Sequence, residues 1–469
     1  MVTDAGGRGG ARPAIPRFPD GFLWGVSTSA HQIEGAADAR EPSVWDVFAA
    51  EPGRIKDGST AAVACDHLHR YREDVALLAD LGAGAYRFSV SWPRVCSPGG
   101  LDFYDRLVDE LCAAGVRPLP TLFHWDLPAR LDWRQRDTAQ RFAEYAALVA
   151  ARLGDRVRQW TTLNEPAEHT LLGHALGVHA PGRRLLFDAL PVAHTQLLAH
   201  GLAVRALRAA GADGVGIANS HSPAWPASPD PADTEAADLY DLLLNRLFAD
   251  PLLLGRYPDG IAEAMPGTPG DVAADLEVIA EPLDWYGINY YAPARVGAPQ
   301  GAGTEFGGVP LPAELPFSVL PIEGRPVTDS GWPVAPEGLT ELLTGLRERY
   351  GDRLPPVLVT ENGCAYEGLD DQERIAYLDS HVRALHRALE AGADVRGYFV
   401  WSLLDNFEWA EGYARCFGLV HVDFETLERV PKASYAWYRD LLRDQGRPTG
   451  PPQPPRPARP ARHGGGPAR

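Results

Sequence analysis

The chain has few cysteines, and their arrangement indicates neither a disulfide framework nor a metal site. Its five cysteines are odd in number, form no CxxC pair, and do not stand at ligand spacing from the fourteen histidines. Disulfide-held secreted domains and zinc sites both depend on such spacings. We therefore interpret the thiols as reduced packing groups, with Cys364 of interest because it follows Glu361 by three residues. The sequence predicts neither a metal nor a cofactor.

Long apolar runs and a basic excess are missing as well. No stretch approaches the ~20 apolar residues of a membrane span, and residues 1–16 lack the apolar core of a signal peptide. The formal charge is −18 and the isoelectric point is near 5.2, so the net field repels nucleic acid and anionic membranes. We predict a cytoplasmic protein whose partner is a small neutral molecule. Its oligomeric state is left open.

What the chain does have is one long region of uniform composition. With 469 residues and 45% hydrophobic content, no shift in composition divides it into several domains. Residues 446–469 contain eight prolines, five arginines and no acidic residue, which is typical of a disordered tail. We predict a flexible segment at 1–17, a catalytic domain at 18–445 and a disordered Pro/Arg-rich tail at 446–469.

Short apolar runs alternate with amphipathic stretches along this domain. Eight runs read as strands: 22–29, 85–91, 117–123, 159–164, 214–219, 285–290, 357–361 and 397–401. Stretches with helical periodicity lie between them, among them 139–153, 234–250 and 371–391. Strands that alternate with helices, without hairpin signals, indicate parallel βα units. The sequence predicts an α/β fold, a single (β/α)8 TIM barrel with long βα loops and its active face at the C-terminal rim.

Two of the predicted strands end in a glutamate. Glu165 follows the fourth strand in Thr162-Leu163-Asn164-Glu165-Pro166, and Glu361 ends the seventh in Thr360-Glu361-Asn362-Gly363. A lone glutamate after a strand is commonly a charge near a helix N-terminus. Two of them across a barrel mouth match the carboxyl pair that cleaves glycosidic bonds.

The sequences around both glutamates resemble the signature motifs of glycoside hydrolase family 1, the β-glucosidase family. The resemblance extends from Phe18 to Leu442. It implies a retaining exo-β-glycosidase that hydrolyses terminal non-reducing β-D-glucosyl residues through a covalent glycosyl-enzyme intermediate. Glu361 is then the nucleophile and Glu165 the acid/base, with carboxyl groups about 5 to 5.5 Å apart.

The resemblance also implies roles for residues at the other strand ends. Trp401 is the platform beneath the sugar, Trp332 lies on the aglycone side, and Arg87 and Tyr291 contact the nucleophile, with Asn289 supporting. The residues implied to hold the sugar are Gln32, His124, Asn164, Glu408 and Trp409. In this interpretation Arg87 and Tyr291 keep the pKa of Glu361 low, whereas the Glu361 charge raises that of Glu165.

The chain departs from the family pattern mainly in three connections, 93–101, 131–133 and 361–371, which are shorter than is usual. Each follows a predicted barrel strand and therefore lies on the active rim. From this we predict a shallow aglycone side that accepts bulky aglycones and uses long cello-oligosaccharides poorly.

Other functions agree less well with the residues. A 6-phospho-β-glycosidase needs cationic groups where this chain has Glu408, whose charge would repel phosphate. A glycan-binding protein without activity has no need of both Glu165 and Glu361, and thioglucosidases lack the acid glutamate. Transglycosylation uses the same intermediate as hydrolysis, so the sequence does not separate the two. The natural aglycone and the choice among gluco, galacto and fuco sugars are also left open.

Removal of residues 446–469 should leave stability and activity unchanged, because the segment has no apolar face with which to dock. The measurement is the melting temperature and the rate on an aryl β-glucoside before and after truncation. A loss of several degrees would show that the tail packs on the domain.

Overall fold

The computed structural model of the protein describes residues 14–265, 268, 270–301, 304–306 and 309–446. Most of the predicted segment 1–17 and of the predicted tail 446–469 lies outside these ranges. Within them, Ile15 packs against the core, and the backbone N–H of Phe18 donates to Gln445 Oε1 at 2.9 Å. No helix in the described part of the chain is both long enough and apolar enough to cross a membrane.

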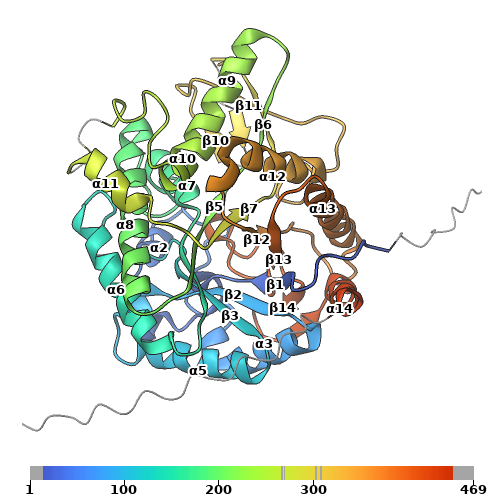
Figure 1. Cartoon of the computed structure of the whole chain (residues 1–469). Coiled ribbons are helices and arrows are strands. Elements are labelled where there is room, and N and C mark those ends of the chain that lie inside the picture. The colour runs from blue at the N-terminus through green and yellow to red at the C-terminus, as the bar shows by residue number, and fades with distance from the viewer. Residues whose placement is uncertain (1–13, 266–267, 269, 302–303, 307–308, 447–469) are drawn as a thin grey trace, which may run out of the picture.

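Eight parallel strands close into a barrel, with the helices arranged around it (Figure 1). The strands are β1 (Leu23–Ser27), β2 (Ala85–Ser89), β3 (Arg117–Phe123), β4 (Gln159–Asn164), β5 (Gly214–Ser220), β7 (Trp285–Asn289), β12 (Val357–Asn362) and β13 (Val395–Trp401). Nearly every residue in them is buried, as expected where parallel strands are covered on both faces. The prediction of a TIM barrel is confirmed.

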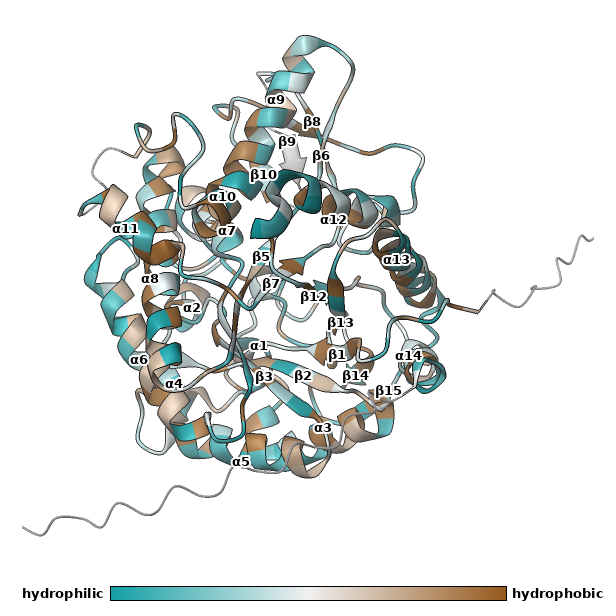
Figure 2. Cartoon of the chain, viewed as in Figure 1, coloured by the Kyte–Doolittle hydropathy of each residue, from teal (hydrophilic) through white to brown (hydrophobic). Residues whose placement is uncertain are grey.

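The outer layer and the loops contain the helices. The α-helices are α1 (Ala30–Ile33), α2 (Val44–Ala49), α3 (His67–Leu81), α4 (Trp92–Val95), α5 (Gly100–Ala113), α6 (Asp137–Leu153), α7 (Pro166–Glu168), α8 (Leu190–Ala209), α9 (Pro231–Asp241), α10 (Leu247–Leu254), α11 (Val272–Ile279), α12 (Pro336–Tyr350), α13 (Gln372–Glu390) and α14 (Ala433–Gln445). Hydrophilic and hydrophobic residues alternate along the outer helices in Figure 2, as in α5 and α6. This pattern fits helices with one face on the barrel and one in water.

Shorter helical segments lie in the loops. Four are 3₁₀ turns: η1 (Ala37–Ala39), η3 (Leu186–Ala189), η5 (Gly351–Arg353) and η6 (Trp409–Glu411). Two are π-helical, η2 (His169–Ala175) and η4 (Leu242–Arg246). The stretch predicted to be helical at 234–250 is helical throughout, with the π-helical segment η4 between α9 and α10. Helical periodicity does not distinguish a π turn from an α turn over so few residues.

Small accessory sheets lie outside the barrel. They are the three-stranded sheet β6 (Ala224–Pro226), β8 (Ala294–Gly297) and β11 (Ser318–Leu320), and the pairs β9 (Thr304–Phe306) with β10 (Val309–Leu311) and β14 (Val420–Val422) with β15 (Arg429–Pro431). Residues of the three-stranded sheet, β10, α9 and η2 form a second apolar cluster, separate from the main core. The loops after β4, β5 and β7 are therefore folded together beside the barrel mouth.

The inside of the barrel changes from apolar to polar toward its mouth. Six side chains from six strands contact one another and so fill the interior: Leu23, Ala85, Leu119, Trp285, Leu358 and Phe399. Because side chains alternate along a strand, Arg87 and Trp401, two residues beyond Ala85 and Phe399, share their inward face. The C-terminal rim thus receives polar and aromatic groups above an apolar plug.

One strand breaks this alternation at the mouth. Between Val359 and Glu361, β12 advances two residues while its neighbour β7 advances one, so β12 contains a bulge. Consecutive side chains of β12 consequently both reach polar groups at the mouth: Thr360 donates to Asn289 Oδ1 at 2.6 Å, and Glu361 accepts from Arg87. The bulge turns Glu361 inward, in line with the known use of bulges to re-aim side chains near active sites.

The loops after the seventh and eighth strands are joined by a buried arginine. The Arg374 side chain is 1% exposed, forms an ion pair with Asp371 at 2.6 Å, and donates to four backbone carbonyls. The carbonyls belong to Cys364, Tyr366, Cys416 and Phe417. Arg374 thereby fixes the segment after Glu361 against the segment that carries Phe417.

Arg374→Leu should destabilise the protein by about 3 to 5 kcal/mol, because it leaves the Asp371 charge buried without its partner and removes the donors of four carbonyls. Arg396→Leu is the matched control: its pair with Asp394 is largely exposed, so a change below about 1 kcal/mol is expected. Both values come from denaturant unfolding. Equal effects of the two substitutions would contradict the role given to Arg374.

Candidate active site

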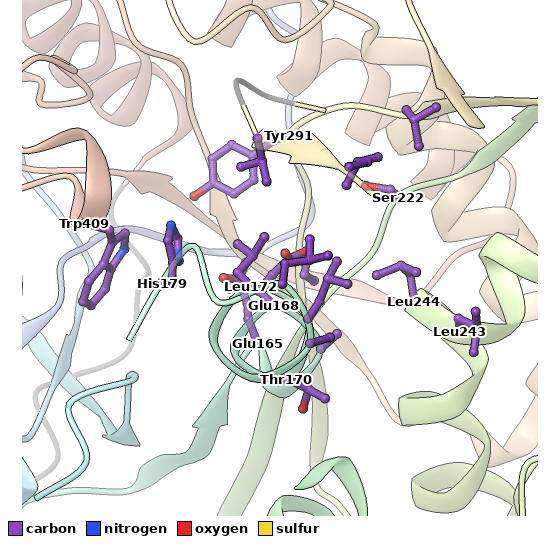
Figure 3. Close-up of a pocket in the computed structure, with 18 of the residues that line it drawn as sticks. Glu165, Glu168, Thr170, Leu172, His179, Ser222, Leu243, Leu244, Tyr291 and Trp409 are labelled. Atoms are coloured by element: carbon purple, nitrogen blue, oxygen red, sulfur yellow. The ribbon is translucent and has the colours of Figure 1, made fainter. Parts of the chain in front are cut away.

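The two glutamates face one cavity of about 270 Å³ at the barrel mouth. Glu361 reaches it from the bulged end of β12. Glu165 follows β4 and begins the short helix α7, with Pro166 at the first helical position. Its backbone is left-handed, with φ 47°, a conformation that is costly for a residue other than glycine. Figure 3 shows Glu165 on the helical turn that borders the cavity.

The nucleophile position predicted at Glu361 is held by two donors. Arg87 Nη1 donates to Oε1 at 2.5 Å, and the Tyr291 hydroxyl donates to Oε2 at 2.8 Å. The prediction that these contacts keep the pKa of Glu361 low was wrong in direction. Burial raises the pKa of Glu361 above its usual value, while Arg87 and Tyr291 only oppose that increase.

Glu165 is placed in a setting that favours its protonated form more strongly. Burial raises the pKa of Glu165 well above its usual range, and the charges of Glu361 and Glu168 raise it further. Its one donor is Asn289 Nδ2, at 2.9 Å from Oε1, and no cation forms an ion pair with it among the described residues. Of the two glutamates, Glu165 is therefore the one that holds a proton.

Asn164 connects the residues that contact the two glutamates with His124. Its Oδ1 accepts from Arg87 Nη2 at 2.5 Å and from Asn289 Nδ2 at 3.0 Å. Its Nδ2 must then donate to His124 Nε2, 3.0 Å away, which leaves the proton of the neutral imidazole on Nδ1. Burial lowers the pKa of His124 well below its usual value, so the ring is neutral. His124 Nδ1 is buried without a described partner and is an unused donor.

Glu408 lies on the cavity wall, and Gln32 contacts it from behind. Gln32 Nε2 donates to Asn406 Oδ1 at 2.9 Å and to Glu408 Oε2 at 3.2 Å, and Ser29 donates to Gln32 Oε1. Burial raises the pKa of Glu408 to about 8. The argument that Glu408 repels phosphate assumed an anion. With this pKa the carboxyl group is mostly protonated at neutral pH, so charge alone does not exclude a phosphorylated sugar.

Aromatic rings line the cavity between these polar groups. Trp401 and Trp409 both stack near His124, with ring centroids 5.6 Å and 5.8 Å from it. Trp332 packs against Tyr291, at 5.1 Å between centroids. Among the predicted residues, those on the cavity wall are His124, Glu165, Tyr291, Trp332, Glu361, Trp401, Glu408 and Trp409. Gln32, Arg87, Asn164 and Asn289 stand behind them in hydrogen-bond contact.

Trp125 and Glu168 are among the wall residues that were not predicted from the sequence. Trp125 packs against Trp409 at 4.7 Å and donates through Nε1 to the Asn164 carbonyl, although it stands beside the predicted His124. Glu168 also lines the cavity, three residues beyond Glu165 on the same helical turn. Because residues three apart on a helix share a face, the spacing from Glu165 could have predicted that Glu168 lies near the same cavity.

Comparisons with known proteins identify the relatives of the chain. The family model "Glycosyl hydrolase family 1" matches residues 15–447. The thermostable beta-glucosidase B of Thermobispora bispora is 46% identical, with 92% of this chain and 91% of that protein covered. A psychrophilic beta-glucosidase of Micrococcus antarcticus has a TM-score of 0.86 at 43% identity, covering 92% and 98% of the two chains. The family 1 β-glucosidase of Thermotoga maritima has the same TM-score at 38% identity, with 92% and 99% covered.

The family model thus spans the whole barrel, including Glu165 and Glu361. Relatives well above 30% identity match over nine tenths of the chain. The protein belongs to glycosyl hydrolase family 1.

Proposed function

We propose that the protein is a retaining exo-β-glycosidase, a β-glucosidase that removes terminal non-reducing β-D-glucosyl residues from small β-glucosides. The observation that carries the proposal is the unequal setting of two glutamates in one cavity. Glu361 contacts a guanidinium and a phenol, whereas Glu165 has one amide donor and a more strongly raised pKa. A nucleophile and a proton donor need these two settings.

In the first step, a carboxylate oxygen of Glu361 attacks the anomeric carbon and the bond to the aglycone oxygen breaks. Glu165 transfers its proton to that oxygen as it leaves. Arg87 and Tyr291 hold the attacking carboxylate in position. The product is a glycosyl ester of Glu361 and a free aglycone.

In the second step, water replaces the aglycone. Formation of the ester removes the Glu361 charge, one of the causes of the raised pKa of Glu165, so that the Glu165 pKa falls. Glu165 then takes a proton from water, and the resulting hydroxide oxygen attacks the anomeric carbon on the face that the aglycone left. Glu361 departs as a carboxylate, and the configuration of the sugar is retained.

The sugar itself is assigned to the end of the cavity that holds Gln32, Glu408 and Trp409. Sugar hydroxyls need donors and acceptors, and the apolar face of a pyranose packs on aromatic rings. The unused donor at His124 Nδ1 and the Gln32–Glu408 pair supply hydrogen-bond partners for the hydroxyls. Trp401 and Trp409 supply the aromatic rings. The names of the related enzymes support glucose as the sugar.

Tyr291→Phe should move the acidic limb of the pH profile of kcat/KM to higher pH by about 1 unit. Catalysis needs anionic Glu361, and loss of a donor to that anion raises its pKa, so more of it is protonated at a given low pH. Tyr366→Phe is the control, because the Tyr366 hydroxyl faces the Val327 carbonyl instead. An unmoved or downward-shifted acidic limb in Tyr291→Phe would contradict the contact's assigned role.

Substitution of each glutamate separates the two roles. Glu361→Gly prevents formation of the covalent intermediate and should lower kcat on every substrate by about 10⁴-fold or more. Glu165→Ala should spare the first step for a nitrophenyl glucoside, whose leaving group needs no proton, so the intermediate should accumulate and be visible by mass spectrometry.

Azide, a small nucleophile, tests which face of the anomeric carbon becomes accessible when each carboxyl group is removed. In Glu165→Ala it should attack the intermediate from the side the aglycone left and give the β-glucosyl azide. In Glu361→Gly it should attack from the opposite side and give the α-azide. Interchanged anomers would exchange the two roles, and α-azide from both variants would overturn the retaining mechanism.

A further inference from the structure

The cavity continues past the glutamates, away from Gln32 and Glu408, into a region with apolar walls. Its walls come from the loops after β4, β5 and β7, none of which is one of the three shortened connections. The side chains that form these walls, here called the apolar chamber, are Leu171, Leu172, Leu243, Leu244, Val309 and Leu315. Figure 3 shows the continuity: Glu165 and Leu172 lie between Trp409 on one side and Leu243 and Leu244 on the other.

The chamber is a surface of the second apolar cluster and not part of its filled core. All six side chains are only partly buried and pack against the cluster from its edge, so each turns apolar surface to the cavity. Two of the walls are the π-helical segments η2 and η4. Single π turns are rare and occur frequently at functional sites, and here both border the same cavity.

One carboxyl group borders the chamber, that of Glu168. Its Oε1 accepts a hydrogen bond from the Ser220 hydroxyl at 3.1 Å, while Oε2 accepts none from the described residues. The side chain is partly exposed to the cavity, and burial raises its pKa. Glu168 lies on the same helical turn as Glu165, and its charge helps to raise the pKa of Glu165, so the two carboxyl groups are neighbours.

We infer that the apolar chamber binds the aglycone, and that the substrates are β-glucosides of a bulky, largely hydrocarbon alcohol with a hydrogen-bond donor near the glycosidic oxygen. The inference rests on the proposed function, because Glu165 protonates the aglycone oxygen and so marks where the aglycone begins. The donor, a hydroxyl or amino group, contacts Glu168, and the hydrocarbon part covers the leucines.

A sugar chain is a poor occupant of this chamber. Each additional glucose unit has several hydroxyl groups that need partners when they leave water. The six chamber side chains offer none, and the polar groups beside them are few: the hydroxyls of Thr170, Ser222 and Tyr240 and one free oxygen of Glu168. Extension of the aglycone by CH₂ groups, in contrast, removes apolar surface from water on both sides of the contact.

A pair of alkyl glucosides tests the apolar walls. Ethyl and octyl β-D-glucoside have leaving groups of similar basicity, so their kcat/KM ratio reports binding of the chain in the transition state. Octyl should exceed ethyl on the order of 10²-fold, and Leu244→Asn should lower that ratio about 10-fold, since it places an amide on the wall. Leu148→Asn, at an exposed leucine of α6, should leave the ratio unchanged. Equal rates for ethyl and octyl, or an unchanged ratio in Leu244→Asn, would overturn the inference.

A second pair of substrates tests the polar contact. The compounds 2-(hydroxymethyl)phenyl and phenyl β-D-glucoside differ by one CH₂OH group next to the glycosidic oxygen. The wild-type protein should favour the hydroxylated compound by about 10-fold, and Glu168→Leu should remove the preference. Any effect of Glu168 on Glu165 is shared by both substrates and cancels in their ratio. A preference that persists in Glu168→Leu would overturn the contact.

The outcomes also separate this inference from the proposed function. If the wild-type protein does not hydrolyse 4-nitrophenyl β-D-glucoside, the β-glucosidase assignment fails. The chamber is then measured directly by calorimetry with octyl and ethyl 1-thio-β-D-glucoside, which need no hydrolysis. Tighter binding of the octyl compound, weakened by Leu244→Asn but not by Leu148→Asn, supports the chamber. Equal affinities overturn it.

Discussion

The buried guanidinium of Arg87 is the interaction on which the mouth of the barrel depends. It is 1% exposed and joins three strands: its own β2, β12 through Glu361, and β4 through Asn164. A cation removed from water this completely is tolerated only if anions and dipoles surround it. Glu361 and the Asn164 amide oxygen provide them. The contacts that stabilise Arg87 thus also join the three strand ends, and they position His124 and Asn289, which are hydrogen-bonded to Asn164.

Most of the fold and the main residues of the site could be predicted from the sequence, because they depend on local order along the chain. The apolar runs set the strands, the right-handed alternation with helices sets the barrel, and Glu165 and Glu361 follow strands four and seven whatever the loops do. The bulge in β12 was different. It arises from how β12 pairs with β7 and β13, and nothing in Val357–Glu361 itself indicates an extra residue.

The sequence also failed where long-range packing decides. The pKa direction of Glu361 depends on how completely the mouth is closed to water, which its two contact residues do not reveal. Glu408 is similar, since its charge state follows from burial and from nearby Glu361 and Glu411. The apolar chamber is built from three loops that are distant in sequence. In the sequence, its apolar residues look like ordinary core residues, because nothing local shows that one side of each faces a cavity.

The end of the cavity proposed for the sugar and the end proposed for the aglycone are therefore formed by different parts of the fold. Barrel strands and the turns that directly follow them carry the groups proposed to contact the sugar, and the barrel closure holds these groups in one arrangement. Loops with their own small core form the other end. Loop residues can change without disturbing the strand ends, so relatives with one chemistry and one sugar preference are free to differ in the alcohol they release.

The left-handed backbone at Glu165 has a consequence for the evolution of the protein. For a residue with a Cβ atom, this conformation costs about 1 kcal/mol or more of stability, whereas glycine adopts it without this steric cost. The buried carboxyl group adds a further cost through its desolvation. Selection for thermal stability alone would therefore favour glycine at this position. In the proposed function, Glu165 is therefore a position where the folded state gives up stability for chemistry.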